Sequence, residues 1–258
     1  MTIERYVELV VKSPLPFLFM LFIIICEYIV YTWKGQKFSF THVLSNFGVL
    51  FLGTTTFSLF SYFVISRDDV LEFTSQYSMF STSVSWGIFL LWLIFFDFIN
   101  YCTHVLYHKS SFFWMFHAVH HSDKTLDAST TIRVPIVASF FTITAYAFLN
   151  FFGISVVLLP ALAQTMFLQQ LLVHSSLFRT TTPSFLTYIF ITPSMHAIHH
   201  TEKYGDKNYG FLFSVWDRLF KTGYFKNYNN ESFGVDFGTA TKNPLKIHME
   251  PMSDFFKQ

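Results

Sequence analysis

Charged residues are scarce in this chain of 258 residues. Lysine, arginine, aspartate and glutamate together make up 13% of the sequence, about half of the share of roughly 25% found in soluble globular proteins. Hydrophobic residues make up 52%, and 36 of them are phenylalanine. So few charges would cover a water-facing surface poorly, so the composition favours a membrane protein and excludes a disordered one. A net charge of +1 also argues against nucleic acid as a partner, because phosphate requires a basic excess.

Cysteines are few, and the glycine-rich motifs of nucleotide-binding proteins are absent from the sequence. The two cysteines, Cys26 and Cys102, lie in apolar runs, which excludes a disulfide framework and a zinc ribbon. We expect both to be buried, unreactive thiols. No Rossmann or P-loop pattern is present. The N-terminal segment lacks the basic start and the cleavage site of a signal peptide, so we expect the first apolar run to be retained.

Several apolar runs are long enough to cross a membrane, which takes about 20 residues. They lie at about 14–33, 43–65 and 84–107, and two more lie between about 134 and 173, with a break near Gly153. The predicted fold is all-α: an integral membrane helical bundle of about four to five spans with a cytoplasmic helical cap. We expect one domain over residues 1–258.

Charges in the short connections predict the orientation. Lys34 and Lys37 lie between the first two runs, whereas residues 66–83 carry an acidic excess. Since basic loops stay in the cytoplasm, the 34–42 loop should be inside and the 66–83 loop outside. His108 and His174 then both lie at the inner face, and residues 109–133 and 175–258 face each other on the cytoplasmic side.

Nine of the eleven histidines lie in four clusters within these inner segments. The clusters are His104 with His108, then His117, His120 and His121, then His174 alone, and finally His196, His199 and His200. Residues three and four apart share one face of a helix, so each cluster presents its imidazoles together. Charged imidazoles would repel one another and buried neutral ones need partners, so the clusters predict metal ligands.

The number of imidazoles predicts two ions. A structural zinc ion takes four ligands, so nine nitrogens fit two metals with four or five each. Imidazole without thiolate suits iron, although zinc and copper bind it as well, and the residues alone leave the metal open. His42 and His248 belong to no cluster, and we expect them to be interfacial or solvated.

Two further residues share helix faces with these histidines. Asp97 lies on one stripe with Tyr101, His104 and His108, and an ionisable group inside a span is functional by default. A carboxylate at this distance is a natural partner for a ligand imidazole. Gln170 lies four residues before His174 and either supports a ligand or packs between spans.

The order of the histidine clusters resembles the fatty acid hydroxylase and sterol desaturase superfamily of integral-membrane di-iron enzymes. The matching segments are FHAVHHS at 116–122, TPSMHAIHH at 192–200, NYG at 208–210 and WDRLF at 216–220. The resemblance covers about residues 97–224, half of the chain. One departure is Val134-Pro135 after Arg133, where many relatives carry a His-Pro pair, and this bears on the lipid-entry region.

The resemblance implies a chemistry and its cofactors. Two iron ions, held by the nine clustered histidines, would activate dioxygen and oxidise an unactivated C–H bond of an acyl, sterol or related lipid chain to an alcohol or an alkene. Asp97 and Asp217 would accept the second N–H of ligand imidazoles, and Asn208 would act similarly. An ordinary ion pair for Asp217, and a plain turn for Asn208 and Gly210, are the alternatives.

The resemblance also implies partners and a location. The sequence contains no haem-binding cytochrome b5 segment, so we expect electrons from a separate donor, either a ferredoxin or a cytochrome b5-like protein with its reductase. A bacterial inner membrane is the expected site. Rival classes are a haem electron carrier, a zinc hydrolase and a metal transporter or other non-catalytic metal-binding protein. They are disfavoured because the histidines lie in tight boxes at the inner boundary and no HisGluxxHis motif is present.

Overall fold

The computed structural model describes residues 5, 13–64, 85–135, 158–180, 184–229, 231–235 and 242–256. In this part of the chain the regular structure is helical, with two isolated β-bridges, so the predicted all-α class is confirmed. The helices are α2 (Leu15–Trp33), α3 (Phe40–Val64), α5 (Trp86–Lys109), α6 (Ser111–His121), α8 (Leu158–His174), α9 (Pro193–His199), α10 (Val215–Leu219) and α11 (Pro244–Phe255), with 3-10 turns η1 (Ala128–Ile132), η2 (Ser176–Phe178) and η3 (Ser184–Tyr188).

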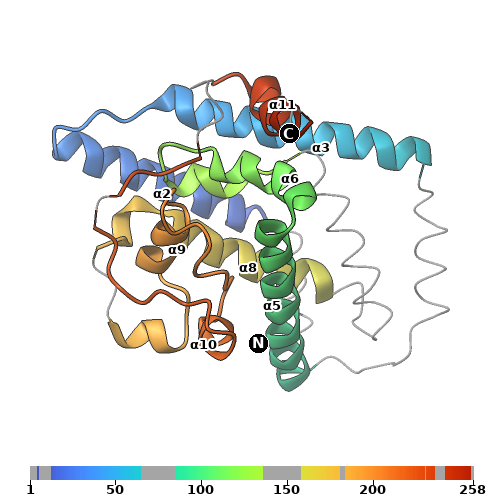
Figure 1. Ribbon diagram of the computed structural model, residues 1–258, viewed down its shortest axis with the longest axis vertical. Coiled ribbons are helices and arrows are strands. Elements are labelled where there is room, and N and C mark those ends of the chain that lie inside the picture. The colour runs from blue at the N-terminus through green and yellow to red at the C-terminus, as the bar shows by residue number, and fades with distance from the viewer. Residues whose placement is uncertain are drawn as a thin grey trace.

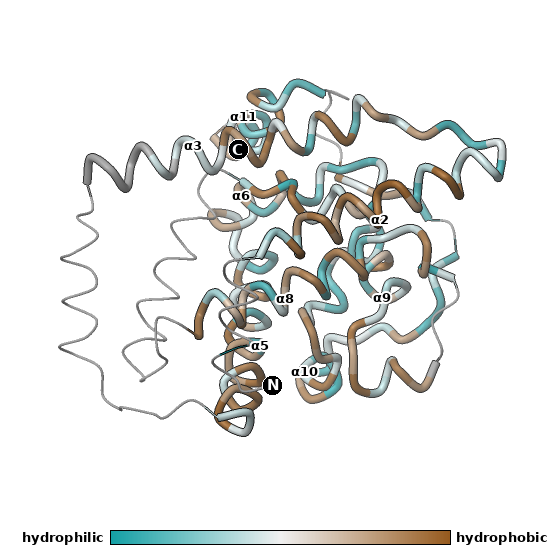
Figure 2. The backbone as a smooth tube through the Cα atoms, turned by 180° about the vertical axis from the view of Figure 1, so that it is seen from behind, coloured by the Kyte–Doolittle hydropathy of each residue, from teal (hydrophilic) through white to brown (hydrophobic). Residues whose placement is uncertain are grey.

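The first three apolar runs form the helices α2, α3 and α5, as predicted. On α2, the side chains of Leu15, Phe17, Phe22 and Ile29 are each more than half exposed. Figure 2 shows the hydrophobic colour along α2 and on the N-terminal half of α5, and both helices have the length and composition to cross a membrane. An exposed apolar face of this kind is typical of lipid contact, which indicates a membrane protein. The fourth predicted run lies largely outside the described residues.

Helix α8, the fifth predicted span, forms the core of the protein. Leu158 and Leu162 pack against Phe89 and Phe96 of α5 in one hydrophobic cluster. Farther along α8, Leu171 belongs to a second cluster with residues of α2, α3 and η1. In Figure 1, α5 runs across the direction of α2, α3 and α8. Helix α5 packs against α6, and α8 packs against η1 and α9. The two clusters therefore hold the predicted ligand-bearing helix ends in place.

A single acid explains how the apolar helix α2 is docked. The carboxylate of Glu27 is completely buried. It accepts hydrogen bonds from the backbone N–H of Ser176 at 2.7 Å and of Ala128 at 3.1 Å, and from the hydroxyl of Ser175 at 3.0 Å. Since a buried carboxylate needs such donors, Glu27 ties α2 to η1 and to the residues that directly follow His174.

The structure contradicts the expectations about four residues, two cysteines and two histidines. Cys102 is exposed and Cys26 only partly buried, because Cys102 lies one turn from the exposed Leu106 on the outer face of α5. His42 and His248 are buried rather than solvated. His248 lies on α11, which packs against α3 and α6 (Figure 1). The ring of His42 is covered from another side, because its Nε2 lies 3.4 Å from a carboxylate oxygen of Asp123 and of Asp127.

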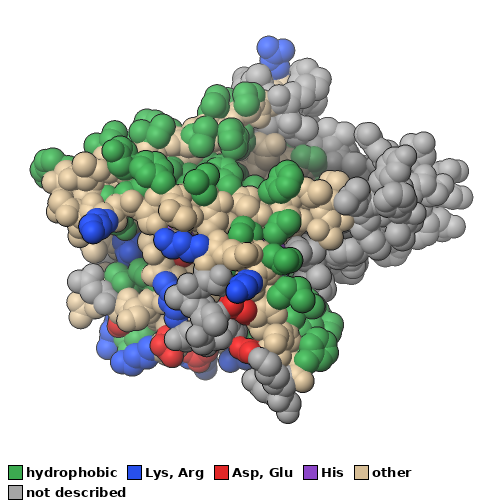
Figure 3. Space-filling model, turned by 90° about the horizontal axis from the view of Figure 1, so that it is seen from above, with side chains coloured by type: hydrophobic (Ala, Val, Ile, Leu, Met, Phe, Trp, Pro, Cys, Tyr) green, Lys and Arg blue, Asp and Glu red, His purple; other side chains and the backbone are tan. Residues whose placement is uncertain are grey.

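The surface of the molecule is divided by polarity. In the view of Figure 3, hydrophobic side chains form a band across the upper part of the face, and charged side chains gather along the lower edge. This division matches a protein with one part in lipid and another part in water.

Candidate metal centre

The structure brings the nine clustered histidines together in two groups. The five-histidine group consists of His104, His108, His117, His121 and His199. The four-histidine group consists of His120, His174, His196 and His200. Within each group, one ring nitrogen from every residue lies within 4.8 Å of the others. The predicted ligand set is thus collected into two sites of five and four nitrogens, with no clustered histidine left over.

Helix geometry explains how each HisxxHisHis box serves both groups. On α6, His117 and His121 are one turn apart and belong to the five-histidine group, whereas the adjacent His120 belongs to the other. Neighbouring residues on an α-helix point about 100° apart, so His120 and His121 cannot converge on one ion. In the last box, His199 and His200 divide between the groups in the same way. The expectation that each box presents its imidazoles together is therefore wrong for His120 and His199, because each box lies between the two groups.

The nitrogen positions fit a bound ion. The Nε2 atom of His174 lies 3.1 Å from Nε2 of His120 and 3.0 Å from Nε2 of His196. In the five-histidine group, Nε2 atoms of His104 and His199 are 3.0 Å apart. Two nitrogens at about 2.1 Å from one metal and at right angles to each other are about 3 Å apart. The spacing therefore matches adjacent ligand positions around one ion in each group.

Backbone carbonyls set the tautomer of four rings. Nδ1 of His104 lies 2.9 Å from the carbonyl oxygen of Tyr209, and Nδ1 of His120 lies 3.3 Å from that of Arg133. Nδ1 of His174 lies 2.7 Å from the carbonyl oxygen of Gln170, and Nδ1 of His199 lies 2.7 Å from that of Lys207. A carbonyl oxygen only accepts, so Nδ1 carries the proton and Nε2 keeps its lone pair. This is the orientation that metal-binding histidines take.

Buried nitrogens without partners give a second indication of metal binding. The Nε2 atoms of His108, His117 and His121 are buried and have no hydrogen-bond partner. All three belong to the five-histidine group. Buried polar atoms are almost always satisfied, and a metal ion would satisfy these three together.

The electrostatics favour neutral imidazoles in the second and last boxes. Burial, with repulsion from neighbouring imidazoles, holds the pKa values of His117, His121, His199 and His200 well below the ordinary value of 6.5. The same causes lower the pKa values of His120 and His196. Because a metal binds only the unprotonated ring, these residues are ready to bind an ion at neutral pH.

The two predicted carboxylates contact the loop beside the rings, not the rings themselves. Asp97 is fully buried and accepts hydrogen bonds from the backbone N–H of Leu212 at 2.7 Å and of Phe213 at 3.1 Å, and from the indole N–H of Trp216 at 2.7 Å. The predicted bond from Asp97 to an imidazole is therefore wrong. A buried carboxylate has no water molecules to donate hydrogen bonds to it, so it accepts hydrogen bonds from the nearest backbone N–H groups. In this fold those donors lie at residues 209–213.

Asp217 acts on the site through one peptide. Its carboxylate accepts from the backbone N–H groups of Tyr209 and Gly210, both at 2.8 Å, and from the hydroxyl of Thr222 at 2.7 Å. The carbonyl of Tyr209 in turn accepts from Nδ1 of His104. Asp217 is thus linked to the His104 ring only through this peptide, and in the described chain neither the predicted direct bond nor the alternative ion pair is present. Burial raises the pKa of this carboxyl.

The turn at Asn208 and Gly210 is shaped for this contact. Asn208 adopts φ +58°, a conformation that asparagine tolerates better than most residues. Its side-chain amide donates to the carbonyls of Met195 at 2.9 Å and Tyr224 at 3.1 Å, so it braces the last box without touching a ring. A Cβ atom on Gly210 would lie 2.6 Å from the carbonyl oxygen of Phe213. Only glycine fits there.

Three supporting contacts were not foreseen in this form. The side-chain amide of Gln170 donates to the carbonyl of Phe211 at 3.0 Å, and it is the backbone carbonyl of Gln170 that faces His174. Arg133 is buried and donates to the carbonyl of Val119 at 2.9 Å, while its own carbonyl faces His120. Glu27 is the single acid inside the apolar run at 14–33, and an acid in such a run is the signal that a functional or buried carboxylate leaves in a sequence.

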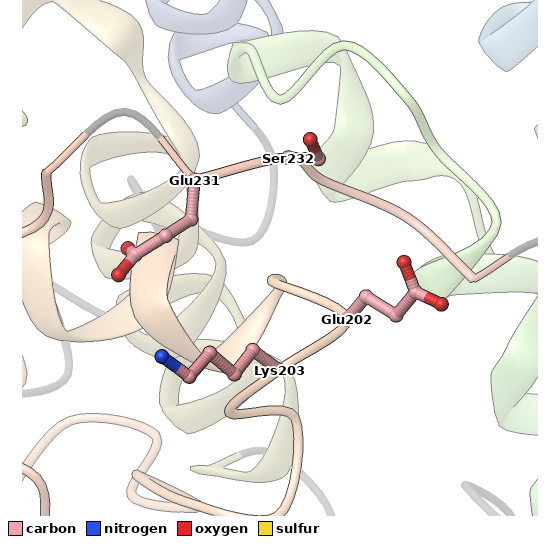
Figure 4. Close-up of a pocket in the computed structure, with 4 residues that line it drawn as sticks. All are labelled: Glu202, Lys203, Glu231 and Ser232. Carbon is pink, nitrogen blue, oxygen red and sulfur yellow. The ribbon is translucent and has the colours of Figure 1, made fainter.

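A charged hollow lies on the outer side of the loop after the last box (Figure 4). It is lined by Glu202, Lys203, Glu231 and Ser232. Close by, the N–H of Gly234 donates to the carbonyl of His200 at 3.1 Å. The lining is polar, so this hollow does not have the apolar character expected of a lipid-chain channel.

Sequence comparisons identify the relatives of the chain. The model of the fatty acid hydroxylase family matches residues 89–222, just over half of the chain. This chain belongs to the fatty acid hydroxylase family. The matched region contains all nine clustered histidines together with Asp97, Asn208 and Asp217, and the resemblance seen in the sequence is confirmed.

Several curated proteins of similar sequence are named monooxygenase or hydroxylase. An alkylglycerol monooxygenase of Caenorhabditis elegans is 35% identical over 134 residues, which cover 50% of this chain and 26% of the relative. One from Xenopus tropicalis is 25% identical over 255 residues, 96% of this chain and 54% of the relative. An ornithine lipid hydroxylase of Rhizobium tropici is 34% identical over 137 residues, 52% of this chain and 40% of the relative. The chain thus spans between a quarter and about half of these relatives, and no solved structure matches it.

Proposed function

We propose that this protein is a membrane-bound lipid hydroxylase that uses two iron ions and dioxygen. The observation that carries the proposal is the division of nine histidines, six of them buried and three partly buried, into groups of five and four nitrogens. Imidazole-rich sites without thiolate suit iron. Membership of the fatty acid hydroxylase family supports the same metal and reaction class.

The residues of this chain have distinct tasks in the proposed reaction. The irons, once reduced, would supply dioxygen activation and C–H oxidation, while the protein holds the ions and excludes water. The five-histidine and four-histidine groups would each hold one ion. Asp97 and Asp217 hold residues 209–213 beside the rings, and Glu27 holds the chain that follows His174. Electrons would come from a separate carrier, either a ferredoxin or a cytochrome b5-like protein.

A lipid is the proposed substrate, and hydroxylation is the proposed outcome. The exposed apolar faces of α2 and α5 support access from a bilayer. The relatives are named monooxygenase or hydroxylase, which favours an alcohol over an alkene. Alkylglycerols, ornithine lipids and free fatty acids are the first candidates to test. We place the histidine groups on the cytoplasmic side, following the charges at Lys34 and Lys37.

Labelled dioxygen tests the proposal directly. Protein loaded anaerobically with ferrous iron should hold two ions per chain. After reduction and exposure to labelled dioxygen with each lipid class, mass spectrometry should find one labelled oxygen atom in the product. Loss of two hydrogens without labelled oxygen would indicate desaturation instead. Turnover that needs zinc and no dioxygen would contradict the proposal and favour a hydrolase.

Two histidine variants provide the matched controls for this experiment. His120→Ala should abolish product and lower bound iron, because His120 belongs to the four-histidine group. His248→Ala removes a buried histidine that lies outside both groups and should leave iron content and turnover near those of the unmodified protein. Full turnover by His120→Ala would refute its role as a ligand.

A further inference from the structure

One tyrosine hydroxyl beside the five-histidine group has no partner. Tyr209 is fully buried, and its hydroxyl makes no hydrogen bond with the rest of the described chain. It is the only tyrosine hydroxyl in the described ranges that is both buried and unpartnered. Protein interiors rarely leave a hydroxyl in this state, so such an atom calls for an explanation.

The ring of Tyr209 packs directly against the five-histidine group. Its centroid lies 5.2 Å from the ring of His108, 5.7 Å from that of His104 and 5.8 Å from that of His199. Tyr107 also packs against this group, with 5.2 Å between its ring centroid and that of His117. The unpartnered hydroxyl is carried by a residue whose ring packs against the five-histidine group.

The backbone leaves Tyr209 little freedom to move. Its N–H donates to Asp217 and its carbonyl accepts from His104. Asn208 before it is held by its own side-chain bonds, and Gly210 after it has no room for a Cβ. The hydroxyl is therefore the one polar group of this residue that the described chain does not satisfy, and the ring that carries it is held against the five-histidine group.

We propose that the Tyr209 hydroxyl donates a hydrogen bond to a small non-protein ligand on the five-histidine ion. The ligand would be water or a small anion that completes the coordination of that ion. This inference rests on the proposed function, because it requires a metal in the five-histidine group. Tyr209 would then distinguish the two ions chemically, since only one would have a phenol beside its exchangeable position.

Azide binding to the iron-loaded protein tests this role without relying on turnover. Tyr209→Phe removes only the hydroxyl, so the variant should still bind two irons per chain. Its dissociation constant for azide, followed by the visible absorption of the ferric protein, should rise about tenfold, equivalent to about 1.4 kcal/mol. Tyr228→Phe is the matched control, because its hydroxyl donates to the carbonyl of Glu231 at 2.7 Å away from the rings. Its azide affinity should not change.

Thermal unfolding provides a second measurement on the same variants. Without metal, Tyr209→Phe should unfold at or above the temperature of the unmodified protein, because it loses no hydrogen bond. With iron and azide, its stabilisation by azide should be smaller than that of the unmodified protein and of Tyr228→Phe.

The outcomes separate this inference from the proposed function. If Tyr209→Phe binds two irons and binds azide as tightly as the unmodified protein does, the hydrogen bond does not exist while the two-iron proposal stands. If Tyr209→Phe loses an iron, the hydroxyl is a ligand or a structural element, and the inference is also overturned. If the unmodified protein itself holds no iron, the proposed function fails first.

Discussion

Replacing Asp217 by asparagine tests how the structure supports the five-histidine group. Asp217 is fully buried and accepts three hydrogen bonds of 2.7 to 2.8 Å, two of them from the consecutive N–H groups of Tyr209 and Gly210. Asparagine has one acceptor oxygen in place of two. In either orientation of its amide, one of these backbone N–H groups therefore loses its acceptor.

The magnitude follows from that loss. A stranded buried donor costs about 1–3 kcal/mol, and the bonds that remain lose the charge that roughly doubles their strength. We expect Asp217→Asn to lower the free energy of unfolding by about 2–5 kcal/mol. Because the Tyr209 carbonyl orients His104, the affinity for one of the two ions should also fall by about 10–100-fold, as for other outer partners of ligand histidines.

Chelator competition and thermal unfolding in detergent measure both effects. Iron-loaded protein should release one ion per chain at a much lower chelator concentration in Asp217→Asn, while the second ion is released as in the unmodified protein. Asp206→Asn is the control, since Asp206 contacts only Lys207 at the surface. Unchanged release of both ions, together with an unchanged unfolding temperature, would refute the reasoning.

Three more predictions address other parts of the structure. His174→Ala removes the ring whose Nε2 lies 3.0 to 3.1 Å from two others of its group; bound iron, measured by elemental analysis, should fall from two ions per chain to one, and two retained ions would contradict its role. The metal-free protein should lose stability as the pH falls below about 6.5, because the histidines of α6 and α9 bind protons in the unfolded chain but not in the folded one. Each such histidine lowers the free energy of unfolding by up to about 1.4 kcal/mol per pH unit. Unfolding temperatures that stay constant from about pH 7.5 to about pH 5.5 would exclude this effect. Glu27→Gln strands the N–H of Ala128 or of Ser176 and should lower the free energy of unfolding by about 1–3 kcal/mol, whereas the exposed Glu202→Gln should not; equal denaturant midpoints for the two variants would show that Glu27 does not dock α2.

The histidine boxes could be predicted because their spacing carries their geometry. Residues three and four apart share a helix face, so the sequence predicted that the three histidines of each box point together. The structure confirms this for His117 with His121 and for His196 with His200, but it places His120 and His199 in the opposite groups, because adjacent residues on a helix point about 100° apart.

The partners of Asp97 and Asp217 could not be predicted for a different reason. Both carboxylates bond to backbone N–H groups of residues 209–213, and every residue but proline carries that donor. A sequence pattern therefore cannot show which peptide lies opposite a buried acid. The burial of His42 and His248 was not predictable for a similar reason, since it depends on distant segments, namely Asp123 and Asp127 beside His42 and α3 beside His248.

The sequence by itself determined the class of fold, the histidine clusters and the family, because hydropathy over about 20 residues and the helical repeat are local properties. The tertiary structure alone decided the five-and-four grouping, the carbonyl acceptors that set the ring tautomers, and the isolated hydroxyl of Tyr209. Each of these depends on which distant segments of the chain pack together. Where they pack, polar atoms are buried, and a buried polar atom without a hydrogen-bond partner costs free energy.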